Sequence, residues 1–286
     1  MQLIKKDVGV NFNLFLFGDV HIGTILHHKH GLQQFIDTMN SEYEGIDPSK
    51  NIAVDHGDAI ESIMVDDKRY DPALVDDPRG TPFDQANEYI ELMQPIKDRL
   101  VCCLMGNHEL KLKKFGNITK YICKELGVPY GTYAAKITYQ DYKGDLVFKH
   151  FATHGRRSIN STADDPKRRK TNMELILKRI LKHKFADALL MSCGHTHKLL
   201  VCKPNQELYL TDDGEHIQQK YTNSHRAAGY IHPDHRWYCN TGCFYRLYAD
   251  GESGYAEVAG YDPVELGYLV VVVRDRKIVK INKEVL

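Results

Sequence analysis

Five short motifs of the sequence contain side chains that can bind a metal ion or transfer a proton. They are GDVH at 18–21, GDAIE at 57–61, GNHE at 106–109, THG at 153–155 and GHTH at 194–197, and the chain has fifteen histidines. Histidine is the commonest metal ligand and titrates near neutral pH. Carboxylate and amide oxygens are metal ligands of a harder kind. The motifs therefore predict a metal centre or an acid–base site.

The spacing inside two of the motifs strengthens this prediction. Asp19 and His21 are two residues apart, as are His195 and His197. In an extended chain both side chains of such a pair point to the same side, so each pair could bind one metal ion. An isolated Asp or His after a strand is often only a cap or a turn residue. The prediction therefore rests on the whole set of motifs.

A predicted strand precedes each motif, and predicted helices lie between the motifs. The expected strands cover 13–17, 51–54, 101–105, 146–153 and 188–193, and the expected helices cover 31–39, 84–98, the stretch from the third motif to 126, and 165–184. Strands that alternate with helices indicate an α/β layered fold. Ligands of open α/β sheets bind at the carboxyl ends of the strands, where these motifs stand.

After His197 the pattern changes to short strands separated by Gly, Asn and Asp turns. Strands are expected at 199–203, 207–210, 236–239, 243–249, 254–260 and 267–273. The regions near 62–83 and 203–235 are polar and rich in turn residues, and we interpret them as surface insertions. The interpretation is a single domain over 1–286, a length that one α/β domain can reach.

Composition and charge restrict the class of protein further. Hydrophobic residues make up 42% and charged residues 27%, which excludes wholesale disorder, collagen and coiled coil. Thirty-eight basic and thirty-eight acidic residues cancel, so any affinity for nucleic acid needs a local patch. Seven cysteines without a C-x-x-C pair predict reduced thiols and a cytoplasmic location. The apolar stretch at 14–17 is too short for a membrane span, so no membrane partner is expected.

In this order, the five motifs resemble the signature of the calcineurin-like metallophosphoesterase superfamily. The resemblance runs from Asp19 to His197, and WYCNTGCF at 237–244 resembles the strand that follows the last motif in many members. The fold that it implies is a four-layer α/β sandwich of two mixed β-sheets flanked by helices. The implied activity is that of a metal-dependent phosphoric ester hydrolase, in which a hydroxide that bridges two metal ions attacks the phosphate ester.

The resemblance also assigns the metal ligands residue by residue. Asp19, His21 and His197 would hold one divalent ion, Asn107, His154 and His195 would hold the second, and Asp58 would bridge the two. Mixed nitrogen and oxygen ligands suit two divalent ions of the transition series, with Mn as the first expectation and Fe, Zn, Ni or Co as alternatives. Such ions lower the pKa of bound water and attract phosphate anions.

Asp58 and His108 are the expected catalytic residues. In the resemblance His108 is not a ligand but lies beside the scissile phosphate, where it stabilises charge or protonates the leaving oxygen. Glu61 and Glu109 follow two of the motifs, and we expect them to support the ligands rather than to react.

The fourth motif departs from the family pattern. Many members have Gly-His there, whereas this chain has Thr153-His154-Gly155, so His150 stays open as an alternative ligand. His154 is preferred because it ends the predicted strand. His56 occupies a position that more often holds a small or apolar residue, and it is either a support for the ligands or a buried histidine at the end of its strand.

Arg156 and Arg157 follow His154 and are the expected phosphate-binding residues. The next predicted helix carries Lys167, Arg168, Arg169 and Lys170, which form either a solvated face or a track for a nucleic-acid backbone. We therefore expect a phosphodiesterase or nuclease that acts on a phosphate ester, with DNA or RNA as candidates. The alternatives are a phosphomonoesterase and a non-catalytic scaffold, although a scaffold tends to lose the ligands that are all present here.

Overall fold

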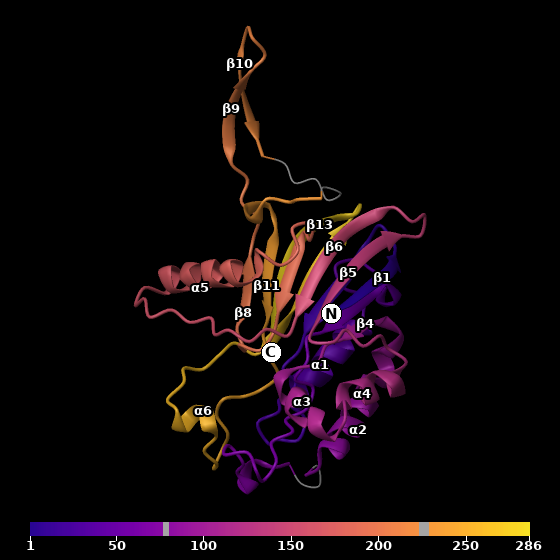
Figure 1. Ribbon diagram of the computed structural model, residues 1–286, viewed down its shortest axis with the longest axis vertical. Coiled ribbons are helices and arrows are strands. Elements are labelled where there is room, and N and C mark those ends of the chain that lie inside the picture. Colours follow the sequence, from indigo (N-terminus) through magenta and orange to yellow (C-terminus); the bar gives the residue numbers. More distant parts are fainter. Residues whose placement is uncertain (77–79, 223–228) are drawn as a thin grey trace.

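Two mixed β-sheets form the body of the protein (Figure 1). The computed structural model describes residues 1–76, 80–222 and 229–286. The parts of the two predicted insertions at 77–79 and 223–228 therefore lie outside the described residues. In the described chain no helix combines the length and the apolar character that crossing a membrane requires.

The first sheet has five strands, and the three neighbouring strands at one side of it carry the first three motifs. Its order is β13 (Lys277–Val285), β12 (Gly267–Arg274), β2 (Phe12–Phe17), β3 (Asn51–Asp55) and β4 (Leu100–Cys103). Strands β2, β3 and β4 are parallel, whereas β12 and β13 are antiparallel to their neighbours. The strands β2, β3 and β4 are entirely buried, as strands covered on both faces must be.

The second sheet has six strands, and two of them carry the last two motifs. Its order is β1 (Gln2–Val8), β5 (Ala134–Asp141), β6 (Leu146–Thr153), β7 (Leu190–Cys193), β11 (Trp237–Thr241) and β8 (Leu199–Cys202). Strand β7 lies parallel to both β6 and β11. Strands β6 and β7 therefore deliver their carboxyl ends to the same edge of the sheet.

The two sheets pack face to face, and their alternating side chains divide the hydrophobic core into layers. Leu14 and Leu16 of β2 belong to the cluster between the sheets, together with Ile137 and Phe148 of the other sheet. The neighbouring residues of β2, such as Phe17, point the other way and pack under helices. This alternation is the two-residue period of a strand buried on both faces.

Helices cover the outer face of each sheet, which confirms the predicted α/β fold with two mixed sheets and flanking helices. Helices α1 (Lys29–Met39), α2 (Pro82–Met93) and α4 (Ile118–Leu126) cover the five-stranded sheet, and α5 (Pro166–Leu181) covers the six-stranded sheet. The N-caps of α2 and α5 follow ordinary sequence preferences. The side chains of Thr81 and Asp165 accept hydrogen bonds from backbone nitrogens in the first turn of the helix, and a proline follows each of them.

Several predicted elements were wrong in their type or bounds. Residues 243–249 form no strand, and 254–260 contain the short helix α6 (Tyr255–Val258) instead of a strand. The helix expected from the third motif to 126 is divided at Gly116 into α3 (Asn107–Lys111) and α4. Short 3₁₀ helices complete the chain at η1 (Pro48–Lys50), η2 (Pro72–Leu74), η3 (Gln94–Arg99), η4 (Leu112–Phe115) and η5 (Pro233–His235).

The two predicted insertions take different forms. Region 203–235 contains a separate hairpin of β9 (Leu208–Asp212) and β10 (Ile217–Tyr221), which stands away from the body (Figure 1). The described residues of region 62–83 are irregular apart from η2 and the start of α2, and the region pairs with the body where Val75 bridges Thr24.

Candidate metal centre

The loops after five strands of the two sheets bring the seven predicted ligands together. The five-stranded sheet contributes Asp19 and His21 after β2, Asp58 after β3 and Asn107 after β4, and the six-stranded sheet contributes His154 after β6 and His195 and His197 after β7. Neither sheet by itself carries a complete set, so the site exists only where the two sheets meet.

The first group of candidate ligands consists of Asp19, His21 and His197. Their ligand atoms lie within 4.8 Å of one another. The Nε2 atoms of His21 and His197 are 3.3 Å apart, and Nε2 of His197 is 3.4 Å from Oδ1 of Asp19. Two imidazole nitrogens and a buried carboxylate that converge in this way could hold a metal ion.

The second group consists of Asp58, His154 and His195, to which Asn107 adds an amide. Nε2 of His154 is 3.3 Å from Oδ2 of Asp58 and 2.9 Å from Oδ1 of Asn107. Nδ1 of His195 is 2.5 Å from the same amide oxygen. These ligand atoms also form a grouping that could hold a metal ion.

The two groups are contiguous because their loops bond directly to each other. The backbone nitrogen of His195 donates to both carboxylate oxygens of Asp19, at 3.1 and 2.9 Å. Glycine is required for this approach, since a Cβ at Gly106 would lie 1.9 Å from Oδ1 of Asp58 and one at Gly194 would lie 2.7 Å from Oδ2 of Asp19.

The backbone at the centre has an unusual conformation. Asp19, His21, Asp58, His195 and His197 all have positive φ, between 52° and 72°. This left-handed region is uncommon for residues other than glycine, and such outliers concentrate at functional sites. The prediction that each i, i+2 pair binds one metal ion from an extended chain is therefore wrong in two respects. None of the four paired residues is extended, and only Asp19 and His21 share a group, whereas His197 belongs to the first group and His195 to the second.

Opposite charges balance one another in the protein without metal. Burial alone would raise the pKa of Asp58, but His154 and His108 hold it well below its usual range. Burial would lower the pKa of His154, yet Asp58 raises it to about 10. For His21 burial is likewise outweighed, chiefly by Glu61, and the pKa rises to about 9. The folded protein therefore carries protons on His21 and His154 at neutral pH, and bound metal ions would displace them.

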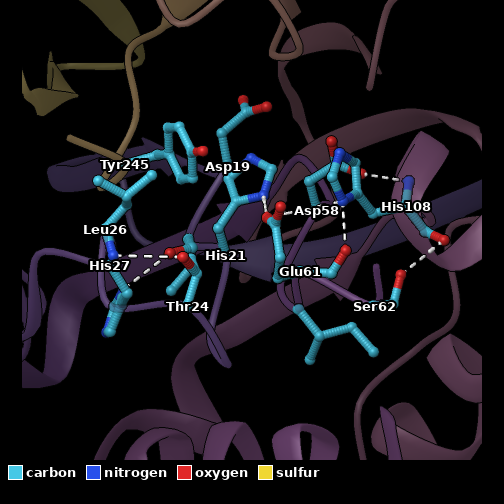
Figure 2. Close-up of polar contacts among 12 residues, drawn as sticks. Asp19, His21, Thr24, Leu26, His27, Asp58, Glu61, Ser62, His108 and Tyr245 are labelled. Atoms are coloured by element: carbon cyan, nitrogen blue, oxygen red, sulfur yellow. Dashed lines mark hydrogen bonds and ion pairs between the residues drawn. The ribbon is translucent and has the colours of Figure 1, made fainter. Parts of the chain in front are cut away.

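Glu61 contacts two histidines of the centre, and Figure 2 shows it between them. Its carboxylate lies 2.6 Å from Nδ1 of His21, which leaves Nε2 of His21 for a ligand role. Nδ1 of His108 contacts the backbone carbonyl of Glu61, and its distance to the Glu61 carboxylate is 3.7 Å. Since a carbonyl can only accept, the neutral His108 ring carries its proton on Nδ1. Burial lowers the pKa of His108 despite Asp58 and Glu61.

Glu109 connects two motif loops through the backbone. Its carboxylate accepts from the backbone nitrogens of Gly106 at 2.8 Å, Asp58 at 3.2 Å and Ile60 at 3.2 Å. Burial raises the pKa of Glu109 to about 7. Its contacts are those of a support for Asp58.

His56 and His150 belong to a buried hydrogen-bonded chain below the centre. Oγ of Ser192 is 2.6 Å from Nε2 of His56 and 2.6 Å from Nε2 of His150. The carbonyl of His56 accepts from Nδ1 of His154 at 2.8 Å. The structure therefore brings His154 into the ligand group and His150 into the core, and it gives His56 a role in orienting His154.

A cleft with a volume of about 1030 Å³ opens onto both ligand groups. Arg156 lines it, whereas the exposed Arg157 is absent from its lining. Tyr245 and Arg69 also line this cleft, and neither is among the residues predicted from the sequence. Tyr245 packs against the rings of His21 and His197, with centroids 4.8 and 5.5 Å apart, and Arg69 lines the cleft from the first insertion. The position of Tyr245 directly after the family-like stretch 237–244 was the available signal.

Comparison with known proteins adds no relative. No protein-family model matches the chain, and a search of the curated proteins finds no match. Whether metal ions fit this centre is therefore judged from its donor atoms. Each group combines a buried carboxylate with imidazole nitrogens, and one histidine of each group has its second nitrogen held, His21 by a carboxylate and His154 by a carbonyl, the arrangement typical of histidine metal ligands.

Proposed function

We propose that the chain is a phosphoesterase that depends on two divalent metal ions, with Mn as the first expectation. The observation that carries the proposal is the contiguity of the two buried ligand groups at the floor of one cleft. Asp19, His21 and His197 would hold one ion, Asn107, His154 and His195 would hold the other, and Asp58 would be shared.

The protein residues around the ions have separate parts in this proposal. Bound divalent ions supply the positive charge that attracts a phosphate ester and the acidity that makes water a nucleophile at neutral pH. Arg156 would contact the phosphate from the rim of the cleft. His108 would transfer a proton at Nε2, because Nδ1 is occupied by the Glu61 carbonyl.

The size of the cleft favours a phosphodiester over a monoester. A volume of about 1030 Å³ exceeds what a phosphate group needs and is at the upper end of the range for pockets that enclose organic ligands. We therefore keep a phosphodiesterase or nuclease as the preferred activity and a phosphomonoesterase as the alternative. A non-catalytic scaffold is disfavoured by the presence of all seven candidate ligands.

Replacement of the shared carboxylate tests the proposal. Asp58→Asn should lose at least one metal ion and most of the turnover of bis-p-nitrophenyl phosphate, because the amide cannot balance two dications. His216→Ala is a matched control, since His216 is exposed on the β9–β10 hairpin, away from the centre. Elemental analysis and turnover with Mn²⁺ after chelation by EDTA are the measurements. Full activity without metal, or two ions retained in Asp58→Asn, would contradict the proposal.

A further inference from the structure

The cleft continues beyond the ligand groups into a region that we call the side chamber. Arg69, Tyr70 and Leu74 of the first insertion line it on one side, and Tyr245, Leu247 and Pro263 line it on the other. Tyr245 packs against the rings of His21 and His197, so this side of the chamber begins at the candidate metal centre. The side chamber thus offers apolar and aromatic surface together with the cation of Arg69, and the carboxylates of Asp71 and Asp262 also line the cleft.

Both sides of the side chamber are attached to the loop that follows His21. On the insertion side the nitrogen of Ile25 donates to the carbonyl of Leu74 at 3.1 Å, and Lys29 pairs with Asp76 at 2.6 Å. On the other side the nitrogen of Arg246 donates to the carbonyl of Leu26 at 2.9 Å. These bonds fix the side chamber relative to the candidate metal centre.

Arg69 is held in one orientation by Asp67. Its Nε and Nη2 donate to the two carboxylate oxygens of Asp67 at 3.1 and 2.9 Å, a bidentate pair. Asp67 also accepts from Nζ of Lys111 at 2.9 Å, and Lys111 lies on α3, the helix that begins at Asn107. In the described parts of the chain Nη1 of Arg69 has no hydrogen-bond partner. A pre-oriented cation with an unused amino group thus lines the cleft.

We propose that Arg69 binds the phosphate of the substrate and that the side chamber receives the second organic group of a phosphodiester, preferably an aromatic one. The inference rests on the proposed function and specifies its substrate class. A monoester would leave the apolar and aromatic surface of Tyr70, Leu74 and Pro263 without a contact, whereas an aromatic ester group would bury it. It also gives the first insertion a function in substrate selection.

Two diesters with the same leaving group test the inference. Bis-p-nitrophenyl phosphate carries a second aromatic group, and methyl p-nitrophenyl phosphate carries a small one. With the Mn²⁺-loaded full chain, Arg69→Gln should lower kcat/KM about tenfold or more on both diesters without loss of metal. Tyr70→Ala should lower kcat/KM about fivefold to tenfold on the bis-aryl ester and leave the methyl ester within about twofold.

Lys68→Gln is the matched control, because Lys68 is exposed in the same insertion and does not line the cleft. If Arg69→Gln behaves like Lys68→Gln on both diesters, Arg69 is not a substrate-binding residue. If Tyr70→Ala affects both diesters equally, the side chamber does not select the second group. Binding of diphenyl and dimethyl phosphate, measured by calorimetry, provides a second readout. If the wild-type protein hydrolyses neither diester, the proposed function fails. The inference is then tested by calorimetry alone: weaker binding of diphenyl phosphate to Arg69→Gln than to wild type supports it, and equal binding contradicts it.

Discussion

The ring of His108 is held at Nδ1 by a backbone carbonyl, whereas Nδ1 of His21 contacts the Glu61 carboxylate. The candidate ligand His154 is held by a backbone carbonyl in the same way, so the proton-transfer role of His108 remains a proposal that the variants below must test. Only a protonated Nε2 of His108 can protonate a leaving oxygen, and burial lowers the pKa of this ring. The proton would therefore be held most readily below neutral pH.

The first prediction at this scale concerns His108→Ala. The variant should keep both metal ions yet lower kcat by about a hundredfold or more on esters with poor leaving groups, because protonation of the leaving oxygen is lost. With p-nitrophenyl esters the loss should be much smaller, since that leaving group needs little protonation. Turnover on both kinds of ester and elemental analysis are the measurements. An equal loss on both, or loss of metal, would show that His108 has another role.

The second prediction at this scale concerns Ser192, the central member of the buried chain. Ser192→Ala removes the partner of His56 and of His150, both of them buried, and should destabilise the fold by about 1–3 kcal/mol. Urea unfolding measures this effect. Ser253→Ala, at an exposed position, is the control. If the free energy of unfolding changes by less than about 0.5 kcal/mol, the range of ordinary surface substitutions, these buried hydrogen bonds contribute little to the packing of the two sheets.

At the scale of elements, helix α5 presents its positive charges unevenly to the cleft. Arg169 and Met173 line the cleft, whereas Lys167, Arg168 and Lys170 are exposed and absent from its lining. For the three outward residues the two alternatives, a solvated face and a track for a nucleic-acid backbone, therefore both stay open. Arg169 is the member of the run that a small substrate could reach.

Helix α5 provides a test of the nuclease preference. If DNA follows the helix, Lys167→Ala, Arg168→Ala and Lys170→Ala combined should weaken binding of single-stranded DNA. The slope of log K against log salt should also flatten by about 0.7 per lost phosphate contact. Turnover of methyl p-nitrophenyl phosphate should not change. A triple Ala variant at the exposed Lys5, Lys50 and Lys124 controls for net charge. An unchanged salt slope in the α5 variant would leave a small diester as the preferred substrate.

At the scale of the whole molecule, the candidate metal centre joins two sheets that would otherwise be held together only by the hydrophobic core between them. In the absence of metal, protonated His21 compensates chiefly the buried carboxylate of Glu61, and protonated His154 compensates chiefly that of Asp58. Metal ions would replace these protons as the positive charge at the sheet junction. The stability of the protein and its metal affinity should therefore both depend on pH.

The direction of this pH dependence follows from the raised pKa values. The folded-state pKa of about 9 for His21 and about 10 for His154 lie above the ordinary value of 6.5. The stabilisation that they provide is complete below pH 6.5 and is lost as the pH rises through 9 to 10. In EDTA the Tm should therefore fall between pH 7 and 9.5. A Tm that rises over this interval would contradict the assignment.

Calorimetry of Mn²⁺ binding in buffers of different ionisation enthalpy provides a separate readout. Loading at pH 7.5 should release about two protons, because both imidazoles must be deprotonated before they bind metal. Binding without proton release would show that His21 and His154 are neutral in the metal-free protein.

The sequence by itself determined the kinds of side chain at the centre and the strands that carry them. A glycine followed by Asp, Asn or His after a buried apolar run is readable locally, because strand burial and turn chemistry depend on neighbouring residues. The edge strands β1 and β13 were missed, since their exposed faces are polar and weaken the apolar signal. Residues 254–260 were misread as a strand because a short apolar run does not distinguish a strand from a helical turn.

Only the tertiary structure decided how the motifs combine. His150 lies on β6 and His154 directly follows this strand, and which of them meets Asp58 depends on the register and pairing of β6, not on local sequence. The placement of Arg69 and Tyr245 depends on contacts between segments more than a hundred residues apart in the chain. Such contacts are set by the packing of one sheet on the other, which no local pattern records.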